Sequence, residues 1–196
     1  IDVTEHKQRE ALIWKQANFD ALTGLFNRRM FYACLESALE KNKRSNKKVA
    51  LLYMDLDFFK EVNDSLGHDA GDALLVEVAR RLESCMRSTD TIGRLGGDEF
   101  AIFLEEVESP EAARKVAENI ATALETPFLL QEENLYASAS IGIALYPDDA
   151  TSVKSLMKNA DQAMYKAKES GRSRCQFFSE KMHVDSMTRM QLSNDL

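Results

Sequence analysis

The chain has 196 residues, of which 44% are hydrophobic and 29% are charged, proportions that are ordinary for a soluble globular protein. Its 25 Lys and Arg residues against 32 Asp and Glu residues give a formal net charge of −7. This acidic balance argues against broad binding to nucleic acid or to an anionic membrane, so we expect no nucleic-acid partner and no direct membrane contact. Binding of a phosphate ligand then requires a local site, made of a few basic side chains or a metal ion.

The cysteines do not indicate a disulfide scaffold. Cys34, Cys85 and Cys175 are odd in number and far apart, and the three histidines show no zinc-ligand spacing. We therefore expect reduced cysteines and a cytoplasmic location, either for the chain alone or for the cytoplasmic part of a larger, membrane-anchored protein. Because the chain begins with Ile1 rather than Met, we expect it to be a piece of something longer.

Residues 4–19 are charged and free of Gly and Pro, which predicts a helix with Thr4 as its N-cap. Its thin apolar stripe suits a signalling or connector helix, which we assign to residues 1–19. Asn27 is placed to cap a second helix from Arg28 to about Lys43. The apolar run VALLYMDLD that follows ends in acids, which is typical of a central buried strand whose last residues emerge at a sheet edge.

The rest of the chain alternates between helical and extended patterns. After that strand we expect, in order, a short helix, a turn from Gly67 to Gly71, a long helix to about Cys85, two strands joined by a tight turn within 90–107, a helix from Pro110 to about Leu124, a strand within 134–147, a helix stopped by Gly171 and a short strand at 174–178. Hairpins mix with helical crossovers, which predicts an α/β (α+β) fold with a mixed central β-sheet surrounded by helices. One domain accounts for residues 20–178, and residues 179–196 are assigned to a C-terminal connector.

Two aspartates, Asp55 and Asp57, end the predicted buried strand just before a helix. A helix cap explains Asp57 well, but it explains two aspartates less well. In the other interpretation, Asp55 projects into a cleft and binds a hard cation such as magnesium, which usually uses one or two carboxylates plus substrate phosphates. The free N–H groups around Phe58 to Lys60 are placed to receive those phosphates.

The stretch RLGGDEFAIF places two glycines and two acids, Gly96 to Glu99, inside an otherwise strand-like run. If the strand that ends at Asp55 lies beside this hairpin, three carboxylates converge and require a cation to offset their repulsion. The glycines permit a tight turn and a close approach of a ligand to the backbone. The alternative is a solvent-exposed hairpin tip that carries charge without a ligand.

RLGGDEF resembles the signature of GGDEF domains, the diguanylate cyclases. Four other stretches resemble family blocks in the same order, namely DALTGLFNRR (20–29), DLDFFKEVNDSLGHDAGDALL (55–75), SIGIALYP (140–147) and ADQAMYKAKESGRS (160–173). The resemblance covers nearly the whole chain from Asp20 to Phe178. It implies a fold similar to the palm-like nucleotide cyclases, with a central sheet wrapped by helices.

The resemblance implies condensation of two GTP molecules into cyclic di-GMP, with release of two pyrophosphates. The 3′-hydroxyl of one GTP attacks the α-phosphate of the other, assisted by two Mg²⁺ or Mn²⁺ ions per active site. By match to the family motif, Asp55, Asp98 and Glu99 supply metal ligands, the Leu56 carbonyl supplies a fourth, and Asp98 and Glu99 are the catalytic residues. Whether Glu99 binds metal or assists deprotonation stays open.

The resemblance also assigns substrate contacts, which in chain order are Phe58, Phe59, Lys60, Asn63, Asp72, Lys168 and Arg172. Asn63 and Asp72 match guanine-binding positions, and a carboxylate suits the donor edge of guanine. The three cations match phosphate-contacting positions. Taken alone, Asn63 and Asp72 suit turns or caps, and Lys168 and Arg172 are favoured by the dipole at a helix C-terminus. Ser173 departs from the Asn that the family usually has, which puts the geometry of that loop in doubt.

RSTD, from Arg87 to Asp90, matches the inhibitory R-x-x-D site that the family carries five residues before its glycine pair. The match implies that Arg87 and Asp90 bind cyclic di-GMP and cause product feedback inhibition. By itself, R-x-x-D is commonly an ion pair at a helix end.

Because one domain holds one GTP and the product has two-fold symmetry, the resemblance implies a homodimer whose domains meet face to face. DVTEHKQRE resembles the tail of PAS sensor domains and RMQLSNDL resembles the connector before EAL phosphodiesterase domains, so PAS-like and EAL-like domains are the expected covalent neighbours. Two other functions stay open: a GTP-binding regulatory module for an attached EAL phosphodiesterase, and a non-catalytic interaction domain.

Overall fold

The computed structural model describes residues 3–130 and 132–182. The strands are β1 (Phe26–Asn27), β2 (Lys48–Leu56), β3 (Thr91–Gly96), β4 (Glu99–Val107), β5 (Phe128–Leu130), β6 (Glu133–Leu135), β7 (Ala139–Tyr146) and β8 (Arg174–Phe177). The helices are α1 (Val3–Asn18), α2 (Arg28–Ser45), α3 (Phe59–Leu66), α4 (His68–Cys85), α5 (Pro110–Glu125) and α6 (Val153–Glu169). Most of the predicted C-terminal connector, from residue 183 onward, lies outside the described residues.

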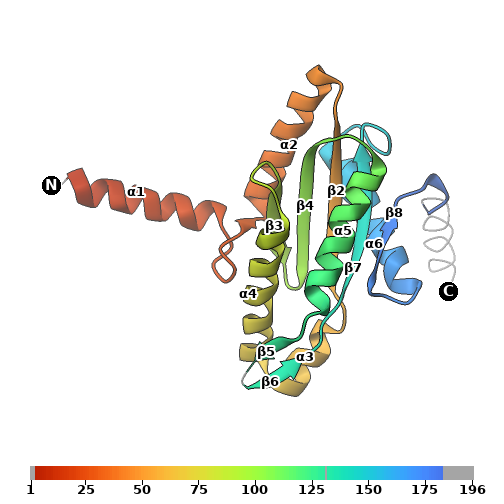
Figure 1. The fold of residues 1–196 in the computed structure, drawn as a ribbon. Helices are drawn as coiled ribbons and strands as arrows, with labels where there is room; N and C mark the ends of the chain where they lie inside the picture. The colour runs from red at the N-terminus through yellow and green to blue at the C-terminus, as the bar shows by residue number, and fades with distance from the viewer. Residues whose placement is uncertain (1–2, 131, 183–196) are drawn as a thin grey trace, which may run out of the picture.

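Within the described residues, six strands form a central sheet in the order β1-β3-β4-β2-β7-β8, and β5 and β6 form a separate hairpin. β2 is antiparallel to both of its neighbours, β4 and β7, whereas β1 is parallel to β3 and β8 is parallel to β7. Figure 1 shows helices on both faces of this sheet. The predicted mixed sheet surrounded by helices is confirmed.

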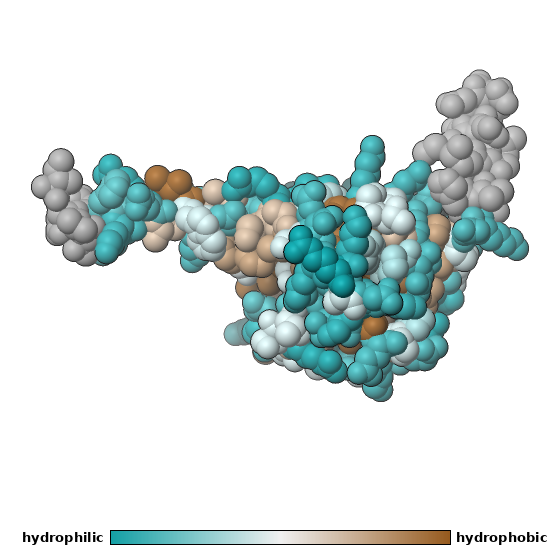
Figure 2. Space-filling view, turned by 90° about the horizontal axis from the view of Figure 1, so that it is seen from above, coloured by the Kyte–Doolittle hydropathy of each residue, from teal (hydrophilic) through white to brown (hydrophobic). Residues whose placement is uncertain are grey.

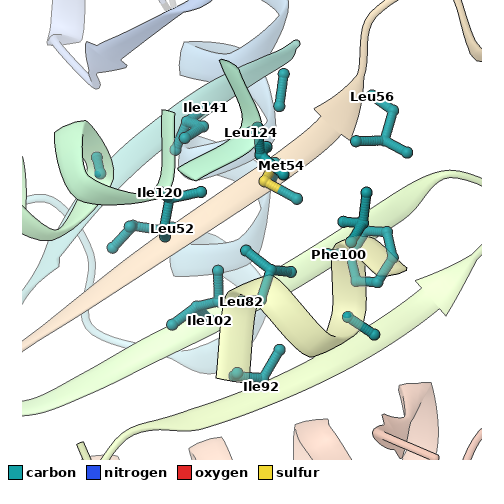
Figure 3. Close-up of a cluster of buried hydrophobic side chains, with 14 of the residues drawn as sticks. Leu52, Met54, Leu56, Leu82, Ile92, Phe100, Ile102, Ile120, Leu124 and Ile141 are labelled. Carbon is teal, nitrogen blue, oxygen red and sulfur yellow. The ribbon is translucent and has the colours of Figure 1, made fainter. Parts of the chain in front are cut away.

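The central strand β2 divides the interior into two cores, because successive side chains of a strand point to opposite faces. Leu52 and Met54 pack with apolar side chains of α4 and α5, in the cluster that Figure 3 shows. Leu51 and Tyr53 pack on the other face, against α2 and α6. Each fully buried aliphatic side chain of this kind contributes about 1.5–3 kcal/mol. Continuing the alternation, Asp55 lies on the α2 and α6 face, where the strand ends.

Helix α1 extends away from the domain as an arm (Figure 1). Leu12, Ile13 and Trp14 on this arm are each more than half exposed, and Figure 2 shows hydrophobic atoms on its surface. The arm joins the domain through aromatic contacts, with ring centroids 5.5 Å apart for Trp14 and Phe19 and 5.1 Å apart for Phe19 and Phe26. In the part of the chain that the structure describes, none of the helices has an apolar stretch able to cross a membrane.

Two predicted element boundaries were wrong. The first helix begins at Val3, so Thr4 lies inside it and does not cap it. Helix α4 begins at His68, so the turn predicted from Gly67 to Gly71 ends at Gly67. Gly71 lies within the helix because α3 and α4 cross there, and a β-carbon at this position would overlap the side-chain oxygen of Asn63.

Residues 134–147 do not form the single strand that their alternating pattern predicts. Their first part belongs to β6, which pairs only with β5, and the second part is β7 of the central sheet. The short strands β1, β5 and β6 have two or three residues each, too few for a periodic pattern to be visible in the sequence.

Candidate functional site

Two neighbouring strands bring the predicted metal-binding acids to one edge of the sheet. In the antiparallel pairing of β2 with β4, Asp55 lies directly opposite Glu99. Asp98 precedes β4 in the hairpin turn, and its carbonyl accepts a hydrogen bond from the Leu56 N–H at 3.3 Å. The strand that ends at Asp55 therefore lies beside the hairpin, as expected. We call the site formed by these three residues, Asp55, Asp98 and Glu99, the acidic edge.

The turn between β3 and β4 is built from two glycines and held by one arginine. Gly96 has a φ of 142° and Gly97 a φ of 51°, values in the left-handed region that favours glycine. The Arg94 guanidinium donates two hydrogen bonds to the Gly97 carbonyl, at 2.8 and 2.9 Å, and forms an ion pair with Asp20 at 3.0 Å. Burial raises the pKa of Asp20, but hydrogen bonds from Thr23 and Arg94 outweigh it, so this pKa lies below its ordinary value.

Asp55 is the buried member of the acidic edge, with 8% of its surface exposed. Its Oδ1 accepts a hydrogen bond from the Lys168 ammonium at 2.8 Å. Burial raises the pKa of Asp55 to about 6 against the opposing effect of Lys168, and the negative charges of Asp98 and Glu99 add to the rise. The acids are thus close enough to disfavour the charge on Asp55, and a cation bound among them would favour it.

Glu99 faces a cation on α2. The Arg28 Nη2 lies 3.9 Å from the Glu99 Oε2, and the Arg28 Nε donates to the Leu95 carbonyl at 3.1 Å. Asn27 caps α2 as predicted, because its side-chain oxygen accepts a hydrogen bond from the Met30 N–H at 3.0 Å. This cap places Arg28 at the first helical residue, beside the hairpin.

The chemistry of the acidic edge fits a hard divalent cation, because carboxylate oxygens are the ligands that magnesium and manganese prefer. Across residues 3–130 and 132–182, no group of three Asp, Glu, His or Cys side chains is arranged to hold an ion by itself. Magnesium usually combines one or two carboxylates with the phosphates of a substrate, so this finding is compatible with a site that bound nucleotide completes. The Lys168 ammonium already lies in a cation position beside Asp55.

The two predicted guanine contacts lie at the crossing of α3 and α4. Asn63 in α3 packs on Gly71 in α4, and Asp72 is the next residue of that helix. Phe59 packs on the same glycine and joins the core behind it. Asp72 is exposed, so its carboxylate is accessible, and Lys60 is exposed on the first turn of α3. The structure therefore places Asn63 against the residue that precedes Asp72, although the two belong to different helices.

The other predicted phosphate contacts lie at the end of α6 and in the loop that follows it. Lys168 is in the last turn of α6, and the Arg172 guanidinium carbon lies 4.9 Å from the centroid of the Phe58 ring. Phe58 is 57% exposed and has a left-handed φ of 59°. It occupies the N-cap position of α3 without a side-chain cap bond, so the interpretation of Asp57 as the helix cap was wrong.

A groove of about 960 Å³ runs between α2 and α6 on the Asp55 face of the sheet. Its lining includes Arg28, Tyr53 and Asp161, and burial raises the pKa of both Tyr53 and Asp161. Neither Asn63 nor Asp72 lines this groove, so it is distinct from the predicted guanine contacts. Arg28, which lines the groove, is also the residue that faces Glu99 of the acidic edge.

The predicted product site, Arg87 and Asp90, is a turn after α4. The Asp90 Oδ2 accepts a hydrogen bond from the Arg87 backbone N–H at 2.9 Å, and the Asp90 N–H donates to the Arg87 carbonyl at 3.1 Å. Among the described residues the Arg87 guanidinium has no hydrogen bond or ion pair, so the ion pair considered as an alternative is not formed. Both residues line a pocket of about 460 Å³ that also includes Phe19.

Sequence reasoning missed the residues that hold the site together, namely Asp20, Arg28, Asp57 and Arg94 in their observed roles. Arg94 and Asp20 both lie in stretches that resemble family blocks, but they are far apart in the chain and nothing local pairs them. Asp57 was visible as the second acid of VALLYMDLD, although its partners come from β7 and from the loop after α6.

Comparison with known proteins identifies the family. The family model described as "Diguanylate cyclase, GGDEF domain" matches residues 17–174. The bifunctional diguanylate cyclase/cyclic di-GMP phosphodiesterase MucR of Pseudomonas aeruginosa is 45% identical over 177 residues, which cover 90% of this chain and 26% of MucR. The chain thus spans about a quarter of the length of that curated relative.

Solved structures agree with the sequence match. The isolated GGDEF domain of TpbB (YfiN) from Pseudomonas aeruginosa is similar with a TM-score of 0.84 and 38% identity, covering 86% of this chain and 99% of that one. The coiled coil and GGDEF domain of DgcB from Caulobacter crescentus, solved in complex with c-di-GMP, has a TM-score of 0.82 and 26% identity, covering 89% and 93%. The fold, the acidic hairpin and these matches together establish that the chain belongs to the GGDEF family of diguanylate cyclases.

Proposed function

We propose that this domain condenses two GTP molecules into cyclic di-GMP and releases two pyrophosphates. The observation that carries the proposal is the acidic edge, where strand register brings Asp55 and Glu99 opposite each other, with Asp98 beside them and Lys168 on Asp55. In a member of the diguanylate cyclase family, this is the arrangement that a reaction between a hydroxyl and a triphosphate requires, because charge must be offset where it develops.

Asp55, Asp98 and Glu99, with the Leu56 carbonyl, would hold two Mg²⁺ or Mn²⁺ ions per active site. When bound, such ions lower the pKa of the attacking 3′-hydroxyl and neutralise the charge of the triphosphate. Glu99 stays a candidate both as ligand and as base, and the Arg28 guanidinium lies 3.9 Å from its carboxylate.

The proposed substrate contacts divide between two sides of the acidic edge. Asn63 and Asp72 would bind the guanine edge at the crossing of α3 and α4, where Asp72 can accept hydrogen bonds that adenine cannot donate. Lys168 and Arg172, at the end of α6, would contact phosphates, as would Lys60 on α3. Phe58 and Phe59 support these contacts: Phe58 stacks with Arg172 and Phe59 packs beneath Asn63 and Gly71.

We propose further that two copies meet face to face, because the product joins two nucleotides symmetrically. Helix α1 supports this, since Leu12, Ile13 and Trp14 present an exposed apolar surface on an arm that leaves the domain. Arg87 and Asp90 are the proposed site of product inhibition, and two observations support that role: the Arg87 guanidinium has no partner in residues 3–130 and 132–182, and a pocket lies beside it. We also keep the cytoplasmic location as a proposal.

A second candidate function is a GTP-binding regulatory module that controls an attached EAL phosphodiesterase. It is favoured by the similarity to MucR, whose name joins both activities. The matched residues cover only 26% of the length of MucR. PAS-like and EAL-like neighbours stay proposals for the parent protein. The intact Asp98 and Glu99 favour catalysis, but GTP binding requires most of the same residues.

Turnover separates these functions. The fragment is incubated at increasing protein concentration with GTP and Mg²⁺, and cyclic di-GMP is measured by chromatography. Product whose rate per domain rises with protein concentration supports the dimeric cyclase. GTP binding without product supports the regulatory module, and the absence of both would contradict each of them.

A further inference from the structure

Asp57 is a buried carboxylate, 5% exposed, whose two oxygens both accept hydrogen bonds. Its Oδ1 accepts from the Ser140 hydroxyl at 2.7 Å, and its Oδ2 accepts from the Ser138 hydroxyl at 2.6 Å and from the Ser173 N–H at 3.0 Å. Among the described residues, no Lys, Arg or His forms an ion pair with this carboxylate. Three neutral donors therefore satisfy the buried carboxylate in place of water.

These hydrogen bonds join three segments that are far apart in the chain. Asp57 directly follows β2, and its own N–H donates to the Ser138 carbonyl at 2.8 Å. Ser138 directly precedes β7 and Ser140 is its second residue, whereas Ser173 belongs to the loop between α6 and β8. The carboxylate thus fixes the loop after α6 relative to the end of β2, and β2 is the strand that carries Asp55.

The loop after α6 has a backbone conformation that needs such support. Arg172 has a φ of 61° and Ser173 a φ of 46°, so two consecutive non-glycine residues are left-handed. A left-handed conformation is unfavourable for such residues, because it brings the β-carbon too close to the following carbonyl oxygen. The Ser173 N–H donates a hydrogen bond to Asp57, and this bond stabilises the conformation that directs Arg172 over the Phe58 ring.

We propose that Asp57 is a positioning residue that holds Arg172 where it contacts the phosphates of bound GTP, an inference that rests on the proposed function. Asp57 acts through the Ser173 N–H and does not touch the nucleotide. Lys168 depends on Asp57 less, because α6 and the ion pair with Asp55 already hold it. Loss of the Asp57 contact should therefore weaken recognition of the triphosphate and leave recognition of the guanine unchanged.

Substitutions of Asp57 can separate the effect of its negative charge from the effect of its hydrogen bonds. In Asp57→Asn, the amide oxygen can replace Oδ2 and accept from both Ser138 and Ser173, while the amide nitrogen donates to the Ser140 hydroxyl, which can turn to accept. Asp57→Ala removes every contact. Ser138→Ala is the matched control, because it removes one hydrogen bond to the same oxygen but leaves the link to Ser173.

The test measures equilibrium binding of GMP and of an α,β-methylene analogue of GTP, which cannot release pyrophosphate. We expect Asp57→Ala to weaken binding of the analogue about tenfold and binding of GMP by less than about twofold, since only the analogue depends on the Arg172 position that the hydrogen bond to Asp57 maintains. Asp57→Asn and Ser138→Ala should keep the ratio of the two affinities. In the Arg172→Ala background, Asp57→Ala should cause no further loss, because its effect passes through Arg172.

Equal losses for GMP and the analogue, or losses that add to those of Arg172→Ala, would overturn the positioning role. If Asp57→Ala does not fold, Asp57→Asn decides: a retained affinity ratio supports the inference, and a selective loss for the analogue overturns it. A parent domain that binds neither nucleotide contradicts the proposed function as well. A parent that binds the analogue, with an Asp57→Ala variant that binds it equally well, contradicts the positioning role alone.

Discussion

The acidic edge and the turn from Arg87 to Asp90 both match motifs of the GGDEF family, but they are built differently. At the acidic edge, β2, the hairpin and α6 meet, and Asp55 is buried against the Lys168 ammonium. At the turn, the two residues bond only to each other's local backbone, and the Arg87 guanidinium is free among the described residues.

The two regions differ in how far the folded domain has assembled them before a ligand binds. Strand register assembles the acidic edge in the folded domain and holds charges together that repel one another. Substitutions there should alter stability and catalysis together. The Arg87 turn contributes little to the fold, so substitutions there should alter inhibition alone.

Asp98→Ala should lower turnover by on the order of 10³-fold, because a carboxylate is lost that would hold the metal ions whose positive charge offsets the transition state. The measurement is the initial rate of cyclic di-GMP formation, and Glu118→Ala, which removes an exposed carboxylate from α5, is the control. A variant that keeps more than about a tenth of the parent rate would place the catalytic charge elsewhere.

Arg94→Lys should lower the free energy of unfolding by about 2–3 kcal/mol, because a lysine cannot reproduce the paired contacts to Asp20 and Gly97. Turnover should fall with it, since the turn that carries Asp98 loses its support. Urea unfolding checks the stability. The control is Arg80→Lys, which changes an exposed pair with Glu77 and should leave the midpoint nearly unchanged. Equal midpoints for the two variants would show that Arg94 does not hold the hairpin.

Arg87→Ala should raise the inhibition constant for cyclic di-GMP by about tenfold or more and leave the initial rate within about twofold. Progress curves with added product measure both quantities, with Arg44→Ala, an exposed arginine of α2, as the control. Unchanged inhibition in Arg87→Ala would remove the assignment of the product site.

Asp55→Asn should stabilise the domain by about 1–2 kcal/mol at pH 8 when divalent ions are absent. The raised pKa of Asp55, about 6 against 3.8 for the ordinary carboxyl, means that the folded state binds the extra proton. The parent therefore loses stability as pH rises from about 4 to 6, and the variant lacks that loss. Adding Mg²⁺ should raise the unfolding temperature of the parent more than that of Asp55→Asn. Equal shifts would argue against metal binding by Asp55.

Much of this fold was predictable because its signals are local. The apolar run of β2, the cap at Asn27 and the glycine pair of the hairpin each determine their own segment. The β5–β6 hairpin was not predictable, since strands of three residues have no readable period. Gly71 was misread as a turn residue because the reason for a glycine there is the contact of α4 with α3.

The candidate site shows the same division. Its acids were found in the sequence because they lie where apolar runs end, and the register of β2 and β4 then placed them together. The support given by Arg94 and Asp57 could not be found this way. Each forms its contacts with residues distant in the chain, and such pairings depend on the finished fold.

The most direct test of the account is a crystal structure of the domain with Mg²⁺ and a non-reactive GTP analogue. The account predicts metal density among Asp55, Asp98 and Glu99, bridged to the phosphates, with Lys168 beside them. The same crystal with ordered nucleotide but with these side chains directed apart and no ion between them would contradict it.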